Sequence, residues 1–119
     1  MFTQRQRLGR WGENKACNYL RRHDYKIIQK NFHASNLGEI DIIARKGNEL
    51  VFVEVKTKQN QHFGLPEEEL TDLKKEKLEF AILYYLETNG LYDQRWRLDL
   101  IAIEILDSKI QLRHYKYVS

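Results

Sequence analysis

The pattern of apolar and polar residues along the chain predicts two helices and five strands. Ala16, Tyr19 and Leu20 recur at helical spacing and predict an amphipathic helix over residues 12–23. Segments rich in Ile, Val and aromatic residues predict strands, and these are residues 26–32, 37–44, 50–57, 98–105 and 110–117. With a second helix after Pro66, the expected order is α-β-β-β-α-β-β.

Turn-forming residues indicate how these segments connect. Gly47-Asn48 suits a tight hairpin, so the strand at residues 50–57 should return antiparallel to the strand at residues 37–44. Asp107-Ser108 predicts a second hairpin before the last strand. Residues 59–66 are polar and contain a glycine, which predicts a loop.

The second helix is expected to run from just after Pro66 to about Thr88, where Asn89-Gly90 ends it. The three consecutive acids after Pro66 complement a helix N-terminus. The stripe that should face the sheet comprises Leu70, Lys74, Leu78, Ala81, Ile82 and Tyr85. Lys74 on this stripe has two interpretations, and both stay open. Its side chain either reaches a phosphate or the acids of the strands, or it extends outward to solvent.

Length and composition restrict the class of protein. A chain of 119 residues with 42% hydrophobic and 31% charged residues is expected to form one globular domain, residues 1–119. The single cysteine, Cys17, cannot form an internal disulfide and fits a small buried side chain in a reducing compartment. No apolar run resembles a secretory signal or a membrane span, so we expect a cytoplasmic protein without a membrane partner.

The net charge of +3 is unevenly distributed. Residues 1–30 contain eight Lys or Arg residues against Glu13 and Asp24. From Ser108 onward there are three basic residues and no acid. Basic ends on one compact domain favour a polyanion such as nucleic acid, although a solvated surface has the same composition.

The first hairpin carries charges where a core is expected. Alternation within residues 50–57 places Val51, Val53 and Val55 on one face and Phe52, Glu54 and Lys56 on the other. In the partner strand, Glu39, Asp41 and Ile43 share a face, opposite to Ile40 and Ile42. Each strand therefore concentrates its charge on one face.

The turn determines which of these residues meet. A loop of two or of four residues gives the same register, in which Lys46 pairs with Glu49 and Ile43 lies opposite Phe52. A three-residue loop would break this pairing.

Continuing the same register sets Asp41 opposite Glu54 and Glu39 opposite Lys56. Directly opposed Cβ atoms lie about 5 Å apart, so Glu39 and Lys56 can form an ion pair. Asp41 and Glu54 repel each other unless a proton or a cation sits between them. Clustered carboxylates suit Mg²⁺ or Mn²⁺, and the alternative is a solvated, charged strand face.

Several motifs together resemble one family. They are Gly9-x-x-Gly12-Glu13, Asn31-Phe32, Gly38-Glu39-Ile40-Asp41, Phe52-Val53-Glu54-Val55-Lys56-Thr57, Gly64, the helical Lys74 and Leu98-Asp99. Over about residues 9–103 the chain resembles the YraN-like family of small uncharacterised bacterial proteins. That family is similar to the PD-(D/E)-x-K superfamily of restriction endonucleases and archaeal Holliday-junction resolvases.

The resemblance implies a restriction endonuclease-like α/β fold, with a mixed sheet flanked by helices and a metal-dependent phosphodiesterase site. It matches Asp41, Glu54 and Lys56 to the three members of the motif, and Glu13 to the helix-borne acid of the resolvases. In that scheme these four residues are catalytic, the three acids and the Val55 carbonyl bind Mg²⁺ or Mn²⁺, and Glu39 supports them. Because resolvase-like relatives are dimers, a homodimer follows by analogy.

From the residues alone, Glu13 has a second interpretation, as an acid that stabilises the first turn of a helix.

Other residues are candidates for binding nucleic acid. Candidate phosphate contacts that would position DNA are Arg5, Arg7, Arg10, Lys58, Lys74, Arg95 and Arg97.

Three functions remain open. The first is a metal-dependent endonuclease that acts on DNA, in particular branched or otherwise structured DNA, in repair or recombination. The second is a nucleic-acid-binding protein that keeps the nuclease fold without efficient cleavage. The third is a protein-interaction module whose acids form only ion pairs.

Overall fold

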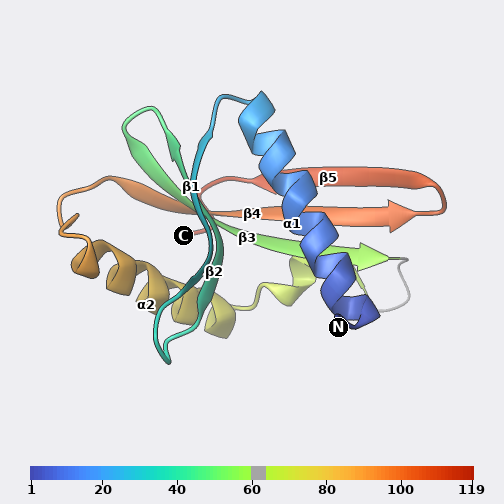
Figure 1. Ribbon diagram of the computed structural model, residues 1–119, viewed down its shortest axis with the longest axis horizontal. Helices are drawn as coiled ribbons and strands as arrows, with labels where there is room; N and C mark the ends of the chain where they lie inside the picture. Colours follow the sequence, from blue (N-terminus) through green and yellow to red (C-terminus); the bar gives the residue numbers. More distant parts are fainter. Residues whose placement is uncertain (60–63) are drawn as a thin grey trace.

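The computed structural model describes residues 1–59 and 64–119 as a mixed sheet with helices on both of its faces (Figure 1). The elements in chain order are α1 (Gln4–Arg22), β1 (Lys26–His33), β2 (Glu39–Lys46), β3 (Glu49–Gln59), the 3-10 helix η1 (Pro66–Glu69), α2 (Asp72–Thr88), β4 (Trp96–Leu106) and β5 (Lys109–Tyr115). The predicted order of helices and strands is confirmed, with η1 as an addition. The loop predicted for residues 59–66 lies partly outside the described residues, at residues 60–63.

The five strands lie in the sheet in chain order. β3 and β4 are parallel, whereas the other three pairs are antiparallel. The predicted register of the first hairpin is confirmed near its turn, since Lys46 pairs with Glu49 and Ile43 with Phe52. Gly47, with a φ of 60°, and Asn48 form the two-residue connection.

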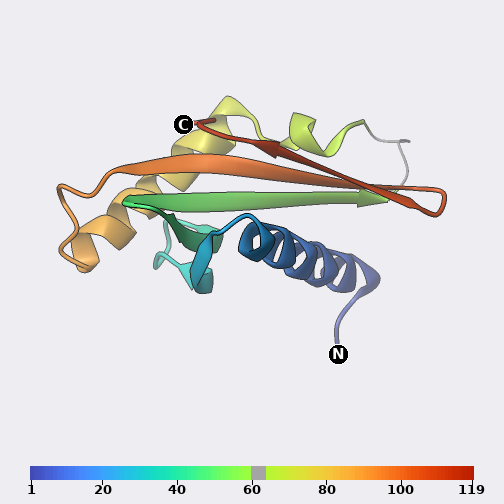
Figure 2. The same cartoon turned by 90° about the horizontal axis from the view of Figure 1, so that it is seen from above.

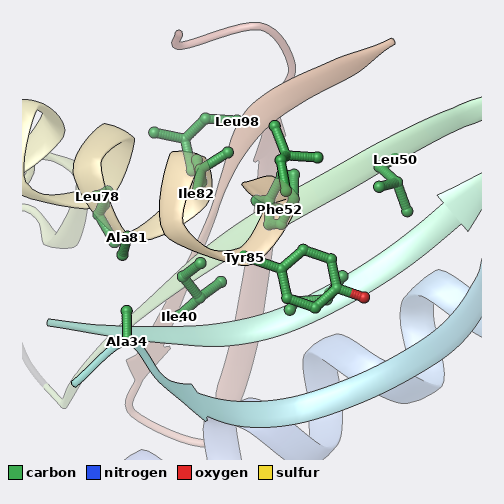
Figure 3. Packing of buried hydrophobic residues seen from close by; sticks show 11 residues of the cluster. Ala34, Ile40, Leu50, Phe52, Leu78, Ala81, Ile82, Tyr85 and Leu98 are labelled. Atoms are coloured by element: carbon green, nitrogen blue, oxygen red, sulfur yellow. The ribbon is translucent and has the colours of Figure 1, made fainter. Parts of the chain in front are cut away.

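Each face of the sheet has its own core. On one face, α1 packs Ala16, Cys17 and Leu20 against strand residues such as Val53 and Ile101. On the other face, α2 contributes the residues shown in Figure 3, Leu78, Ala81, Ile82 and Tyr85, which pack against Ile40, Phe52 and Leu98. Figure 2 shows α1 on one side of the long strands β3 and β4, and η1 with the start of α2 on the other.

α1 begins at Gln4, so the predicted start at residue 12 was wrong by two turns. The Thr3 side chain accepts a hydrogen bond from the Gln6 amide (3.1 Å), and the Gln6 side chain accepts one from the Thr3 amide (2.9 Å). This capping box satisfies two of the amides that lack a partner at the start of the helix. Gly9 and Gly12 lower the helix propensity here, which is why the sequence pattern concealed the earlier start.

The second predicted helix is divided in two, because η1 ends at Glu69 and α2 begins only at Asp72. Thr71 caps α2 by accepting a hydrogen bond from the Lys74 amide (3.2 Å). The prediction that Leu70 and Lys74 share the buried stripe of one helix was therefore wrong: Leu70 precedes α2 and the Lys74 side chain is exposed.

β2 separates from β3 partway along the hairpin. Their pairing ends at Ile42 and Val53, and Figure 1 shows the far end of the β1–β2 hairpin curving toward α2 while β3 continues in its own direction. Ile42 belongs to the α1-side core and Ile40 to the α2-side core, so the prediction that they share a face was wrong. The bend thus interrupts the alternation of β2 at Asp41.

No helix within residues 1–59 and 64–119 has both the length and the apolar character that a bilayer crossing requires.

α1 crosses β3 at unusually short range. A Cβ atom added to Gly12 would lie 1.9 Å from the Thr57 hydroxyl oxygen and 3.0 Å from the Thr57 Cβ. Only a residue without a side chain allows this approach, and the contact places the next residue, Glu13, beside the strand.

We expect opposite effects of alanine at the two glycines of α1. Gly9→Ala should raise the free energy of unfolding by about 0.5–1 kcal/mol, because alanine favours a helix and no atom lies within 4 Å of the new Cβ. Gly12→Ala should lower it by about 1–3 kcal/mol, because Thr57 and α1 must move apart. Urea unfolding measures both, and stabilisation by Gly12→Ala would contradict the close approach.

Candidate active site

Asp41 lies where β2 leaves β3, and its side chain replaces part of the lost pairing. Asp41 Oδ2 accepts a hydrogen bond from the backbone amide of Val55 (2.9 Å). The bond holds the carboxylate against β3 although the two backbones have separated. The predicted ladder pair of Asp41 with Glu54 does not form, yet the side chains still meet.

Two carboxyl groups share this position. Burial raises the pKa of Asp41, and the charge of Glu54 and a hydrogen bond to it raise it further, to about 9. The Glu54 side chain is only 14% exposed, so water screens this repulsion poorly. At neutral pH the pair therefore retains a proton unless a cation replaces it.

Lys56 lies beside the same pair, with its Nζ 3.6 Å from Glu54 Oε2. The prediction that Glu39 lies opposite Lys56 was wrong, because β2 has left β3 before that row. Glu39 pairs instead with His33 of β1, and their side chains are 3.8 Å apart. Lys56 is thus held by an acid of the site rather than by Glu39.

Glu13 approaches the acids from α1. Burial raises the pKa of the Glu13 carboxyl to about 7, with a further contribution from the charge of Asp41, while Lys30 and Asn31 oppose the shift. Because α1 begins at Gln4, Glu13 is not in the first turn, and the reading as a helix-start acid was wrong. The structure therefore brings Glu13 into the electrostatic field of Asp41.

Asn31 links two of the acids and was not selected as a site residue from the sequence. It is a non-glycine residue of a strand with a φ of 53°, located between the paired rows Lys30–Ile42 and Phe32–Ile40. With its amide nitrogen turned toward the acids, it donates to Glu13 Oε1 (3.0 Å) and Glu39 Oε1 (3.2 Å). Asparagine tolerates the left-handed region better than most residues, and this preference, together with the Asn31-Phe32 motif, is the signal for this position.

The donor set fits a hard divalent ion only in part. Mg²⁺ is commonly held by one or two carboxylates together with waters and substrate phosphates, and Asp41 with Glu54 provides such a pair. Within the described part of the chain, no three acidic, histidine or cysteine side chains converge closely enough to hold a metal ion. Asp41 and Glu54 thus supply two carboxylates, and Glu13 lies near them without completing such a cluster.

Three grooves adjoin the acids. The first, which we call the basic groove, has a volume of about 290 Å³ and is lined by Leu37, Gly38, Glu39, Glu54, Lys56, Lys74, Lys77 and Leu78. The second, of about 280 Å³, is lined by Arg10, Glu13, Asn14, Lys30 and Asn31, and the third, of about 350 Å³, by Phe2, Gln6, Gly9, Arg10, Glu13 and Glu39. Lys77 and Lys30 were not selected from the sequence, since nothing local marks a surface lysine as part of a groove.

The other predicted phosphate contacts differ in their surroundings. Arg5 and Arg7 line a separate groove near the start of α1, and none of the acids of the site lines it. Lys58 forms an ion pair with Glu69 (2.7 Å). Arg95 is exposed just before β4.

Arg97 is not available to a phosphate, so that prediction was wrong. Its guanidinium is buried and contacts Asp99 (3.0 Å), Glu49 (2.9 Å) and the Tyr25 hydroxyl (2.7 Å). His114 completes the cluster, with Nε2 2.7 Å from Asp99 Oδ2. These contacts make Arg97 a structural residue that anchors β4.

The chain matches a known family over most of its length. Residues 12–103 match the family model described as "Uncharacterised protein family UPF0102". A UPF0102 protein of Syntrophomonas wolfei is 39% identical over 90% of this chain and 92% of its own length. One of Carboxydothermus hydrogenoformans is 40% identical over 96% of both chains, and one of Geobacter sulfurreducens is 44% identical over 83% of this chain and 77% of its own length.

The raised pKa values predict how stability depends on pH in metal-free protein. Between the ordinary pKa of Asp41, 3.8, and its folded value of about 9, the folded state binds more protons than the unfolded state. Stability is then highest at low pH within this window and falls as pH rises. From about pH 6 to about pH 8 we expect a loss of about 1–3 kcal/mol, to which Glu13 contributes at the lower end.

Urea unfolding at several pH values measures this slope. Asp41→Asn should leave only the shallower contribution of Glu13, because asparagine does not titrate and its side-chain oxygen can still accept the Val55 hydrogen bond. Equal slopes in parent and variant would show that Asp41 is not forced to keep its proton.

Proposed function

This chain belongs to the uncharacterised protein family UPF0102, and we propose that it is a Mg²⁺- or Mn²⁺-dependent endonuclease that hydrolyses phosphodiester bonds in DNA. We further propose branched or otherwise structured DNA as its substrate, in repair or recombination. The observation that carries the proposal is the meeting of Asp41 and Glu54, with Lys56 beside them, where β2 and β3 separate. The restriction endonuclease-like identity of the fold is part of the same proposal, supported by the mixed sheet and by the order of these residues on adjacent strands.

The residues can be assigned distinct roles. Asp41 and Glu54 would hold the divalent ion, with the Val55 carbonyl as the further ligand that the resemblance implies. A divalent ion in such a site supplies charge stabilisation and lowers the pKa of water. Lys56 adds positive charge where negative charge develops on the phosphate oxygens.

Glu13 is suited to handle a proton. Its raised pKa of about 7 means that both protonation states are populated near neutral pH. A carboxylate with this property can accept a proton from an attacking water and later return it. Asn31, which donates to Glu13, would hold this carboxylate in place.

One observation favours a second function. Within the described residues no third metal-ligating side chain converges on Asp41 and Glu54, and a two-carboxylate site depends on waters or substrate for its remaining ligands. A protein that binds nucleic acid through this fold without efficient cleavage fits that arrangement as well. Binding of DNA without any cleavage in Mg²⁺ or Mn²⁺ would favour this second function.

We expect Mn²⁺ to raise the melting temperature of the protein. An ion that binds only the folded state stabilises it by about 2.7 kcal/mol at a hundred times its dissociation constant, which is several degrees for a domain of this size. Asp41→Asn should abolish the rise while keeping or increasing the stability of the metal-free protein, because the repulsion with Glu54 is gone.

Asp93→Asn removes an exposed acid far along the chain and serves as the control, which should respond to Mn²⁺ like the parent. If Mn²⁺ does not change the melting temperature of the parent, the proposed metal site is contradicted and a protein-interaction module is favoured.

Cleavage of linear and branched DNA in Mg²⁺ or Mn²⁺ tests the reaction itself. Glu54→Gln and Lys56→Ala should each lower the rate by about 10²–10³-fold, the usual effect of removing one group that stabilises the transition state. Lys109→Ala, an exposed lysine on the β4–β5 hairpin, is the matched control and should cleave at the parent rate. If the two site variants cut as fast as the parent, the cleavage comes from a contaminating nuclease.

A further inference from the structure

The basic groove lies directly beside the acids and presents three lysines. Lys56 comes from β3, and Lys74 and Lys77 come from α2. Because Lys74 and Lys77 are three residues apart on a helix, their side chains project from the same face. A phosphate chain that leaves the Asp41–Glu54 pair along this groove meets both α2 lysines.

The two α2 lysines differ from their neighbours in how their charge is balanced. Both are exposed, and among the described residues neither ammonium group forms a salt bridge with an acid. Lys75, between them in sequence, lies 3.7 Å from Asp72 and does not line the groove. Among the lysines of α2, the two without a salt bridge are thus the two that line the groove, and the charge of Lys74 also contributes to the lowered pKa of Glu69.

The remaining lining restricts what the groove can accept. Glu39 and Glu54 line the groove on the strand side and repel phosphate there, whereas Leu37 and Leu78 add apolar surface that suits sugar and base. A volume of about 290 Å³ is at the lower end for pockets that hold small organic molecules. A double helix is too wide to enter such a space, whereas a short part of a single strand can lie in it.

We propose that the basic groove binds a single-stranded segment of nucleic acid that flanks the phosphodiester to be cleaved, with Lys74 and Lys77 contacting its phosphates. This rests on the proposed nuclease function for its biological meaning. Single strands are commonly bound in positively charged grooves that follow the backbone. The substrate would therefore be nucleic acid with an unpaired segment next to the cleavage position, such as a branch or an overhang.

Binding measured without metal separates this inference from the nuclease proposal. A short fluorescent single strand and the blunt duplex of the same sequence are titrated in EDTA, and anisotropy gives both affinities. The parent should prefer the single strand. The double variant Lys74→Ala/Lys77→Ala should lose about tenfold in affinity for it, and the slope of log affinity against log salt should fall by about 0.7 for each lost phosphate contact.

Lys75→Ala is the matched control, since it removes the same charge from the same helix outside the groove. It should bind the single strand like the parent. Lys74→Gln/Lys77→Gln keeps most of each side-chain stem and should reproduce the loss seen with alanine, which excludes a packing defect. Melting curves of all variants verify that they fold.

Three outcomes would overturn the inference: an unchanged affinity in the double variants, an equal loss in Lys75→Ala, or a parent that prefers the duplex. Failure of the nuclease proposal has a different signature, which is the absence of cleavage and of a Mn²⁺ response. Because the binding assay contains no metal and no cleavage step, its result stands whichever way those measurements turn out.

Discussion

The carboxyl groups of Asp41 and Glu54 meet where β2 and β3 separate. The two groups cannot both be charged there without a counterion. The hydrogen bond from the Val55 amide holds the Asp41 side chain in this position against the repulsion. A proton or a cation must therefore accompany the pair. Lys56 lies beside Glu54 and lessens the repulsion, but burial still raises the pKa of Asp41 far above its ordinary value.

The same sheet contains a carboxylate with the opposite surroundings. Asp99 is fully buried, but Arg97 and His114 hydrogen-bond to it, and the amide of Tyr117 donates to it as well. These contacts tie Asp99 to residues of β4, β5 and the segment after β5. Asp41, by contrast, has a strongly raised pKa, no basic side chain bonded to it among the described contacts, and grooves beside it. A carboxyl group of this kind is more typical of a functional position, so we propose the site at Asp41 and not at Asp99.

The helices give the two sides of the site different characters. On the α1 side, the close contact of Gly12 with Thr57 places Glu13 near Asp41, and the left-handed Asn31 connects Glu13 with Glu39. On the α2 side, lysines line a groove that continues from Glu54 and Lys56. Glu13 thus approaches Asp41 from α1, whereas Glu54 and the lysines line the groove on the α2 side.

The order of elements, the two hairpins and the register around Ile43 and Phe52 followed from local features, because side-chain period and a two-residue turn act within a few positions of the chain. That register also brought Asp41 near Glu54. Packing between distant segments decided the rest. The bend of β2 toward α2 ends its pairing with β3 at Ile42, so Glu39 pairs with β1 and not with Lys56. Arg97 is buried because it packs against Tyr25 and Asp99. The groove formed by β3 and α2 likewise exists only because Lys56 and Lys77, distant in sequence, are brought together by the fold, and no local pattern encodes such a meeting.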